Sequence, residues 1–229
     1  MDRLSLWAIL FGASIICYYF ISCYLALIVF AALVYSVLAS LHIIGEVEFN
    51  LGSIRKSVVY FKKHTGAYKD SGKYFQEAME ILKKFKLQDN YECNTFGMYY
   101  DDPKTTPENE CRYVVGIMSV ETHSDVKPNK ELEDYLLKEQ DGWFTAELPY
   151  AATIISRFDI HFPSLIFIPI IRYYKALPKK FEDKEFLAKM KFDPKNIPGI
   201  LEICRKGKFE ICIPTKNDTK FELMEVVKS

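Results

Sequence analysis

The sequence predicts an α+β domain that follows one long apolar segment at the N-terminus. Residues 4–44 contain no lysine, arginine, aspartate or glutamate. In the remainder, short runs of strand character alternate with stretches of helical periodicity. The order strand-helix-strand-strand occurs twice, which predicts an antiparallel sheet with two helices on one face and the opposite face free to bind. We therefore expect an anchor at residues 1–45, a folded domain at 46–214 and a short polar tail at 215–229.

The apolar segment is long enough to cross a membrane. As one helix, residues 4–44 would extend about 60 Å, roughly twice the thickness of the hydrocarbon core of a bilayer. Three interpretations remain open: one tilted span, a hairpin that turns near Ser22 and Cys23, and a signal peptide cleaved after Val37 and Ala39. A single span is favoured, because no proline or polar turn divides the segment and its apolar stretch is longer than that of a signal peptide.

The charges that flank this segment predict its orientation. Only Arg3 precedes it, whereas residues 55–63 supply four lysine and arginine residues shortly after it. Because cytoplasmic flanks carry the excess of such residues, the folded domain is expected to face the cytosol. The glycosylation acceptor triplet that begins at Asn217 should then carry no glycan.

The first repeat is predicted from hydrophobic spacing. Residues 58–63 are rich in valine and aromatic side chains and are expected to form a strand. In residues 73–85 the apolar positions recur at helical spacing. Residues 96–100 and 111–118 are two further strands, joined by a connection rich in proline and acidic residues.

The second repeat has the same order. Residues 143–148 and 151–159 are predicted as strands, and the helix that follows carries its buried stripe at 170–177. A hairpin of two strands, residues 200–204 and 208–213, ends the repeat.

Charge and cysteine content disfavour two classes of protein. The 30 lysine and arginine residues equal the 30 aspartate and glutamate residues, so no summed positive field would attract a nucleic acid. The six cysteines include no C-x-x-C pair, which argues against a zinc knuckle or a thioredoxin-like motif. They fit reduced thiols that pack as small apolar groups in a reducing compartment.

The sequence gives no positive sign of catalysis, and we expect no metal and no cofactor. It has no phosphate loop, nucleophile elbow or dinucleotide-binding glycine pattern. The histidines, His42, His64, His123 and His161, are scattered and lack metal-ligand spacing. His64 is close in sequence to Asp70, which leaves a proton relay open, although a structural histidine is the favoured interpretation.

Several motifs carry a resemblance to one known family. They are residues 63–68 (KHTGAY), residues 98–103 (MYYDDP) and the ending LEIC-RKGK-FEICIP. With the anchor before it, the chain resembles the membrane-anchored eukaryotic form of the GyrI-like domain, the testis-expressed protein 264 family of endoplasmic reticulum (ER) phagy receptors. The resemblance spans most of the chain. It implies two β-α-β-β repeats and a location in the ER membrane.

The resemblance also implies a ligand site. In ligand-binding members, a glutamate on the E-[IV]-[YC] strand faces a groove lined by aromatic side chains and contacts drug-like cations. The matching residue here is Glu202, and Tyr68, Tyr100 and Trp143 are candidate groove aromatics. The alternatives are a salt-bridged or solvent-facing carboxylate and aromatic side chains that fill the core.

A partner follows from the resemblance as well. The family's ER-phagy receptors carry a long acidic tail whose aromatic-x-x-aliphatic motif adds a strand to ubiquitin-like autophagy modifiers. In this chain 15 residues follow Pro214, and the nearest match begins at Phe221. It is a loose one, because Met224 stands where leucine, isoleucine or valine is expected, and the alternative is a frayed polar tail.

Together these observations predict a non-catalytic ER adaptor whose cytosolic domain binds partners. The alternative is a membrane-tethered domain that binds a small hydrophobic molecule, or a weak hydrolase, at the groove near Glu202.

Overall fold

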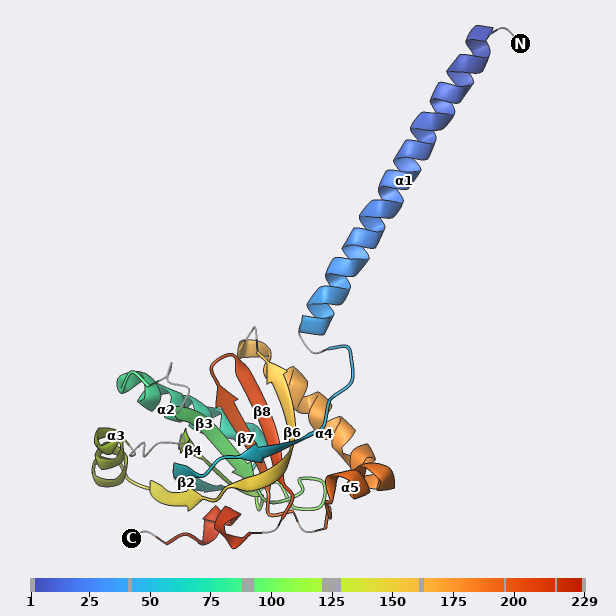
Figure 1. The fold of residues 1–229 in the computed structure, drawn as a ribbon. Helices are drawn as coiled ribbons and strands as arrows, with labels where there is room; N and C mark the ends of the chain where they lie inside the picture. Colours follow the sequence, from blue (N-terminus) through green and yellow to red (C-terminus); the bar gives the residue numbers. More distant parts are fainter. Residues whose placement is uncertain are drawn as a thin grey trace. The chain divides into compact units, whose positions relative to one another are not determined.

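The computed structural model describes residues 3–40, 43–87, 93–120, 129–160, 163–195, 197–216 and 218–227. His42, His123, His161 and Asn217 lie outside these residues. The chain divides into two compact units, Met1–Gly45 and Glu46–Ser229, which are described separately (Figure 1).

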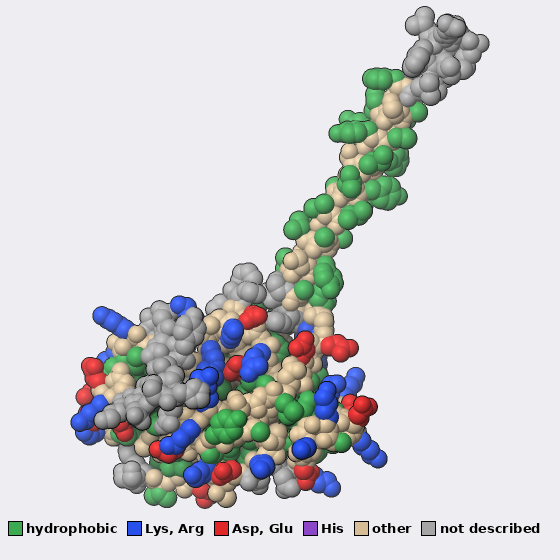
Figure 2. Space-filling model, in the orientation of Figure 1, with side chains coloured by type: hydrophobic (Ala, Val, Ile, Leu, Met, Phe, Trp, Pro, Cys, Tyr) green, Lys and Arg blue, Asp and Glu red, His purple; other side chains and the backbone are tan. Residues whose placement is uncertain are grey.

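The first unit is one unbroken helix, α1 (Arg3–Ser40). Because Ser22 and Cys23 lie inside this helix, the hairpin interpretation is wrong. Its stretch Phe11–Ala39 is long and apolar enough to cross a membrane, with a length of about 44 Å. Large side chains such as Phe11 (70% exposed) and Phe30 (66%) are not buried by the chain itself, and Figure 2 shows apolar side chains along the visible face.

The second unit is built on one antiparallel sheet of eight strands, which confirms the predicted α+β class. Their spatial order is β1-β6-β8-β7-β3-β4-β2-β5. Seven of the strands match predicted runs, and β1, at one edge, was not predicted. Their bounds are β1 (Asn50–Ile54), β2 (Ser57–Thr65), β3 (Cys93–Tyr99), β4 (Arg112–Val120), β5 (Phe144–Leu148), β6 (Ala151–Asp159), β7 (Ile200–Arg205) and β8 (Lys208–Pro214).

Two long helices pack on the same face of this sheet (Figure 1). They are α2 (Ser71–Lys84), which buries Ala78 and Leu82, and α4 (Phe167–Glu182), which buries Tyr173 and Leu177. Three shorter helical segments accompany them: α3 (Lys130–Asp134), the π-helical turn η2 that continues it (Tyr135–Glu139), and α5 (Lys184–Met190). We assign α2 and α4 to the same face because residues that pair directly on neighbouring strands point to the same side of a sheet.

The opposite face of the sheet is covered rather than free. Two short 3-10 turns after β8, Thr219–Phe221 and Leu223–Glu225, bring Phe221 and Leu223 onto it, and both side chains are 0% exposed. The Tyr100 hydroxyl donates to the Phe221 carbonyl and accepts from the Leu223 amide, each at 3.0 Å. The Lys63 ammonium donates to the carbonyl of Met224 at 2.7 Å. The expectations of a frayed polar tail and of a free sheet face are therefore wrong for the described residues.

Replacing Phe221 by alanine tests whether this C-terminal segment belongs to the core. We expect the free energy of unfolding to fall by about 3–5 kcal/mol, the usual loss when a buried phenylalanine is truncated. Urea unfolding of the full chain in detergent micelles measures it. Val227→Ala is the matched control, because that side chain is 84% exposed and should change stability by less than about 0.5 kcal/mol. Equal effects of the two substitutions would contradict the assignment.

Candidate functional site

Glu202 lies at the centre of the sheet, under the helices. On β7 it pairs with Gly97 of β3 and with Ile211 of β8, and it is 5% exposed. Gly97 has no side chain, and this leaves room for the ring of Phe75 from α2: a Cβ atom there would lie 2.8 Å from the Phe75 ring. The sheet and the helices thus enclose the carboxyl group of Glu202.

Tyrosine hydroxyls, rather than a cation, satisfy this carboxyl group. The hydroxyl of Tyr174, from α4, donates to Oε1 of Glu202 at 3.0 Å. The hydroxyl of Tyr99 interacts with the same carboxyl, and it lies 3.2 Å from Oγ of Ser71, within hydrogen-bonding distance. Within the described residues, no lysine or arginine forms an ion pair with Glu202.

Burial sets the protonation of Glu202. It raises the pKa of the carboxyl from 4.5 to about 7, although hydrogen bonds from Tyr174 and Tyr99 act in the opposite direction. Near neutral pH the group therefore exchanges between a neutral and a charged form. The charged form is costly because no cation compensates it, so an incoming organic cation would supply the missing charge. Access would require Tyr174 and α4 to move.

Tyr68 lies one side chain away from Glu202. Its ring contacts the ring of Tyr99 edge to face, with centroids 4.9 Å apart. Its hydroxyl accepts from the backbone amide of Asp101 at 2.9 Å. Tyr99 thus connects Tyr68 to Glu202 in a single cluster of aromatic side chains.

Tyr100 and Trp143, by contrast, are not near Glu202. Neighbouring residues of an extended chain point to opposite sides, so Tyr99 faces the helices and Tyr100 faces the C-terminal segment. Trp143 is buried under α2 and α3 in a separate cluster. The structure therefore does not assemble the four predicted residues into one groove.

Sequence reasoning missed Tyr99, Tyr174 and Ser71, which contact Glu202 or each other. Tyr99 could have been identified as a neighbour of Glu202 only if the pairing register of β3 and β7 had been known. Glu202 pairs with Gly97, and Tyr99 lies two residues further along β3, on the same face. Tyr174 could not be chosen over Tyr173 without the rotation of α4.

The loose autophagy-modifier motif is not available in this conformation. Phe221 is fully buried, and the backbone around it is bound to Tyr100. A motif that adds a strand to a partner needs an exposed aromatic side chain and a free backbone edge.

The remaining candidates for chemistry lie in structural positions. Burial, more than the nearby Lys62 and Lys73, lowers the pKa of His64 to about 4, while the Glu77 charge partly opposes this shift. The imidazole stacks on Tyr74, with ring centroids 3.5 Å apart. Burial raises the pKa of Cys204 and of Cys212 to about 12, so both thiols stay protonated. No group of three His, Cys, Asp or Glu residues that could hold a metal ion occurs in the described parts of the chain.

Comparison with known families agrees with this architecture. The model of the GyrI-like small molecule binding domain matches residues 56–140. The first half of the folded domain is therefore similar to this family. Glu202, on β7, lies outside the matched stretch.

Curated relatives are similar to this chain over most of its length. The testis-expressed protein 264 homolog of Mus musculus is 27% identical over 173 residues, which is 76% of this chain and 50% of that protein. Testis-expressed protein 264 of Homo sapiens is 25% identical over 201 residues, 82% of this chain and 57% of that protein. The predicted resemblance is confirmed, and the chain spans about half the length of these relatives.

Solved structures similar to this chain are distant in sequence. The C-terminal domain of EcmrR is 12% identical, with a TM-score of 0.43, over 75% of this chain and 99% of that chain. SAV2435 bound to tetraphenylphosphonium is 9% identical, with a TM-score of 0.44, over 74% and 94%. Identities this low transfer neither a ligand nor an activity to this chain.

The buried carboxyl of Glu202 predicts a pH dependence of stability. The folded state, with a pKa of about 7, holds the proton more tightly than the unfolded state, with a value of 4.5. The associated stabilisation is complete below pH 4.5 and is lost as the pH rises through 7. From pH 5 to pH 8, the free energy of unfolding of the wild type should therefore fall by about 2–3 kcal/mol relative to Glu202→Gln.

Urea titrations at the two pH values measure this difference. Glu147→Gln serves as the control because that carboxylate is largely exposed, and it should follow the wild type. A Glu202→Gln variant whose pH dependence equals that of the wild type would show that Glu202 does not titrate in this range.

Proposed function

We propose that the chain is a single-span ER membrane protein whose GyrI-like domain faces the cytosol and binds partners for selective turnover of ER membrane. The observation that carries this proposal is α1, in which none of the Phe11–Ala39 window is buried within the chain. Exposing that many large apolar side chains to water is unfavourable, whereas a bilayer accommodates them.

Two further observations support the orientation and the organelle. The cations at residues 55–63 follow the helix closely, which favours a cytosolic domain. The role in ER turnover rests on the similarity to testis-expressed protein 264. Because the chain matches about half of those relatives, their partners are carried over only as part of the proposal.

The proposal includes no catalytic step. Glu202 is buried, whereas His64 and Cys204 are half-buried. In the described residues Glu202 is bonded to the Tyr174 hydroxyl and His64 stacks on Tyr74, so neither forms a dyad of a nucleophile and a base. Binding of an autophagy modifier would use a surface other than Phe221, or would need its segment to be released from the sheet.

Glycosylation mapping tests the orientation. With a cytosolic domain, the acceptor at Asn217 should remain unmodified in cells, and the protein should stay in the membrane pellet after an alkaline carbonate wash. An acceptor tag added at the N-terminus should be glycosylated and serves as the positive control. A glycan removed by endoglycosidase H and abolished by Asn217→Gln would place the domain in the lumen and contradict the proposal.

An ER-turnover assay tests the role itself. In starved cells that lack the protein, delivery of a tandem fluorescent ER reporter to lysosomes should be reduced. The full chain should restore it, and so should a chimera in which an unrelated single-span helix replaces residues 1–45. Residues 46–229 alone should not, since the tether is missing. Normal delivery in cells without the protein would contradict the proposed role in ER turnover.

A second candidate function is favoured by the uncompensated carboxyl of Glu202. In this candidate the GyrI-like domain binds a lipophilic cation between the sheet and α4. Titration with the fluorescent cation rhodamine 6G distinguishes the two functions. Saturable binding that Glu202→Gln abolishes and Glu147→Gln leaves intact would support the small-molecule function. Equal signals from all three proteins would leave the partner-binding function alone.

A further inference from the structure

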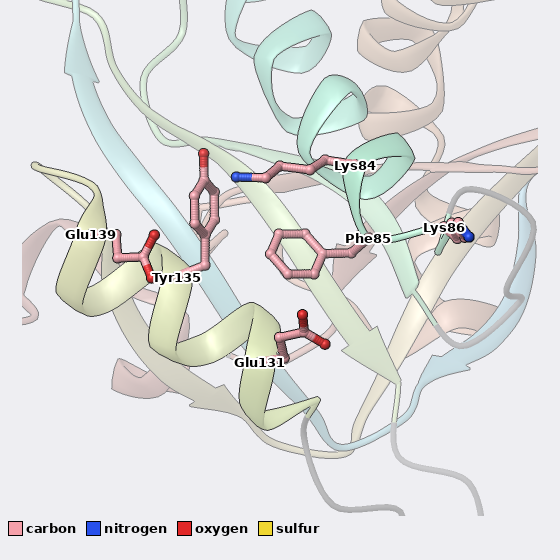
Figure 3. A pocket seen from close by; sticks show the side chains of 6 residues that line it. All are labelled: Lys84, Phe85, Lys86, Glu131, Tyr135 and Glu139. Carbon is pink, nitrogen blue, oxygen red and sulfur yellow. The ribbon is translucent and has the colours of Figure 1, made fainter.

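A separate hollow lies between the end of α2 and the π-helical turn η2 (Figure 3). Its volume is about 460 Å³, within the range of small-molecule sites. Two aromatic rings, two carboxylates and two ammonium groups line it, from Phe85, Tyr135, Glu131, Glu139, Lys84 and Lys86. None of these residues contacts Glu202 in the described interactions, so the hollow is a different place from the buried site.

One wall of the hollow already holds a cation. The Lys84 ammonium lies 3.6 Å from the centroid of the Tyr135 ring and 5.7 Å from that of Phe85. The two rings are 5.2 Å apart. The negative end of a helix dipole explains a lysine in the last turn of α2, but it does not explain why the ammonium sits on an aromatic face. The ring of Tyr135 is therefore a cation seat, occupied here by a flexible and largely exposed side chain of the protein itself.

The π-helical turn brings two carboxylates to the same place. Glu131, Tyr135 and Glu139 are spaced by four residues, and in a regular α-helix each such step rotates about 40° past a full turn. The wider turn at Tyr135–Glu139 counteracts that rotation, so all three side chains line the hollow. Figure 3 shows Glu139 beside Tyr135 and Glu131 below the ring of Phe85.

These carboxylates are also available. On the same helical segment, Asp134 forms an ion pair with Lys138 at 2.7 Å. No ion pair is formed by Glu131 or Glu139 among the described residues, and both are exposed. An aromatic face flanked by two unpaired carboxylates attracts an ammonium group both through the ring quadrupole and through charge.

We propose that this hollow binds a small organic cation of the ammonium or quaternary ammonium class, which displaces Lys84 from the face of Tyr135. Lys84 acts as an internal competitor for the seat, and Glu131 and Glu139 flank the bound cation. This site goes beyond the proposed membrane function and does not depend on it.

Calorimetric titration of the full chain with choline tests the proposal. The protein is kept in dodecyl maltoside at low ionic strength, because that detergent has no ammonium group. The matched probe is 3,3-dimethyl-1-butanol, in which carbon replaces the charged nitrogen. Choline should bind at least about fivefold more tightly than this alcohol, in line with a cation–π seat.

Variants assign the binding to the hollow. Lys84→Gln should tighten choline binding about two- to fivefold, because the competitor is removed. Lys83→Gln changes the same charge on the neighbouring residue of α2, outside the hollow, and should leave the affinity unchanged. Tyr135→Leu should abolish binding, whereas Tyr135→Phe, which keeps the ring, should retain it. Circular dichroism confirms that each variant is folded.

Three outcomes would overturn the proposal. Equal affinity for choline and the neutral alcohol would show that charge is not recognised. Equal effects of Lys84→Gln and Lys83→Gln would reduce the result to general electrostatics. Binding that persists in a folded Tyr135→Leu variant would place the cation elsewhere. None of these results bears on membrane anchoring, so failure here and failure of the proposed function are distinguishable.

Discussion

Burial of both faces of one antiparallel sheet is the constraint on which the folded domain depends. The strands carry large apolar side chains on each side, such as Tyr60 and Ile117 on one face and Phe61 and Met118 on the other. A single layer of helices can cover only the first face. The second is covered by the segment after β8, whose Phe221 and Leu223 reach zero exposure. A short stretch with mostly polar composition is thereby as much a part of the core as a helix.

Burial of the sheet also determines the protonation of Glu202. Strand pairing places its carboxyl on the helix-covered face, where Tyr174 and Tyr99 are its hydrogen-bonding partners. Hydroxyl groups satisfy lone pairs but bring no charge, so burial dominates and the pKa rises towards neutrality. A fold that needed only stability would be served equally well by an apolar residue at this position. The uncompensated carboxyl of Glu202 is therefore the feature of the buried cluster that stability explains least.

Much of this fold could be predicted from hydrophobic periodicity, and the failures have physical causes. Both long helices and seven strands follow from spacing, because each presents a regular apolar stripe or a dense apolar run. Strand β1 does not, since Asn50–Ile54 contains a glycine and little apolar character. Its Gly52 instead allows close approach to Ile155 of β6, a tertiary contact without a local signal. Glu202 was chosen by resemblance, and Tyr100 was named among the candidate groove aromatics, whereas the structure places Tyr99 on the face of Glu202. Only the register across β3 and β7 distinguishes adjacent tyrosines.

The two charged sites on this domain differ in how they would discriminate ligands. At Glu202 the carboxyl is dry, titrates near neutrality and is covered by α4, so a ligand must displace packed side chains and finds full charge only above about pH 7. At the hollow beside Tyr135 the carboxylates are exposed to water, and among the described residues the group on the ring to be displaced is the Lys84 side chain. Binding at Glu202 should therefore be slow, selective for apolar cations and dependent on pH. Binding beside Tyr135 should be fast, weak and sensitive to salt, because solvent screens its charges. The two sites would respond to different molecules even though both recognise positive charge.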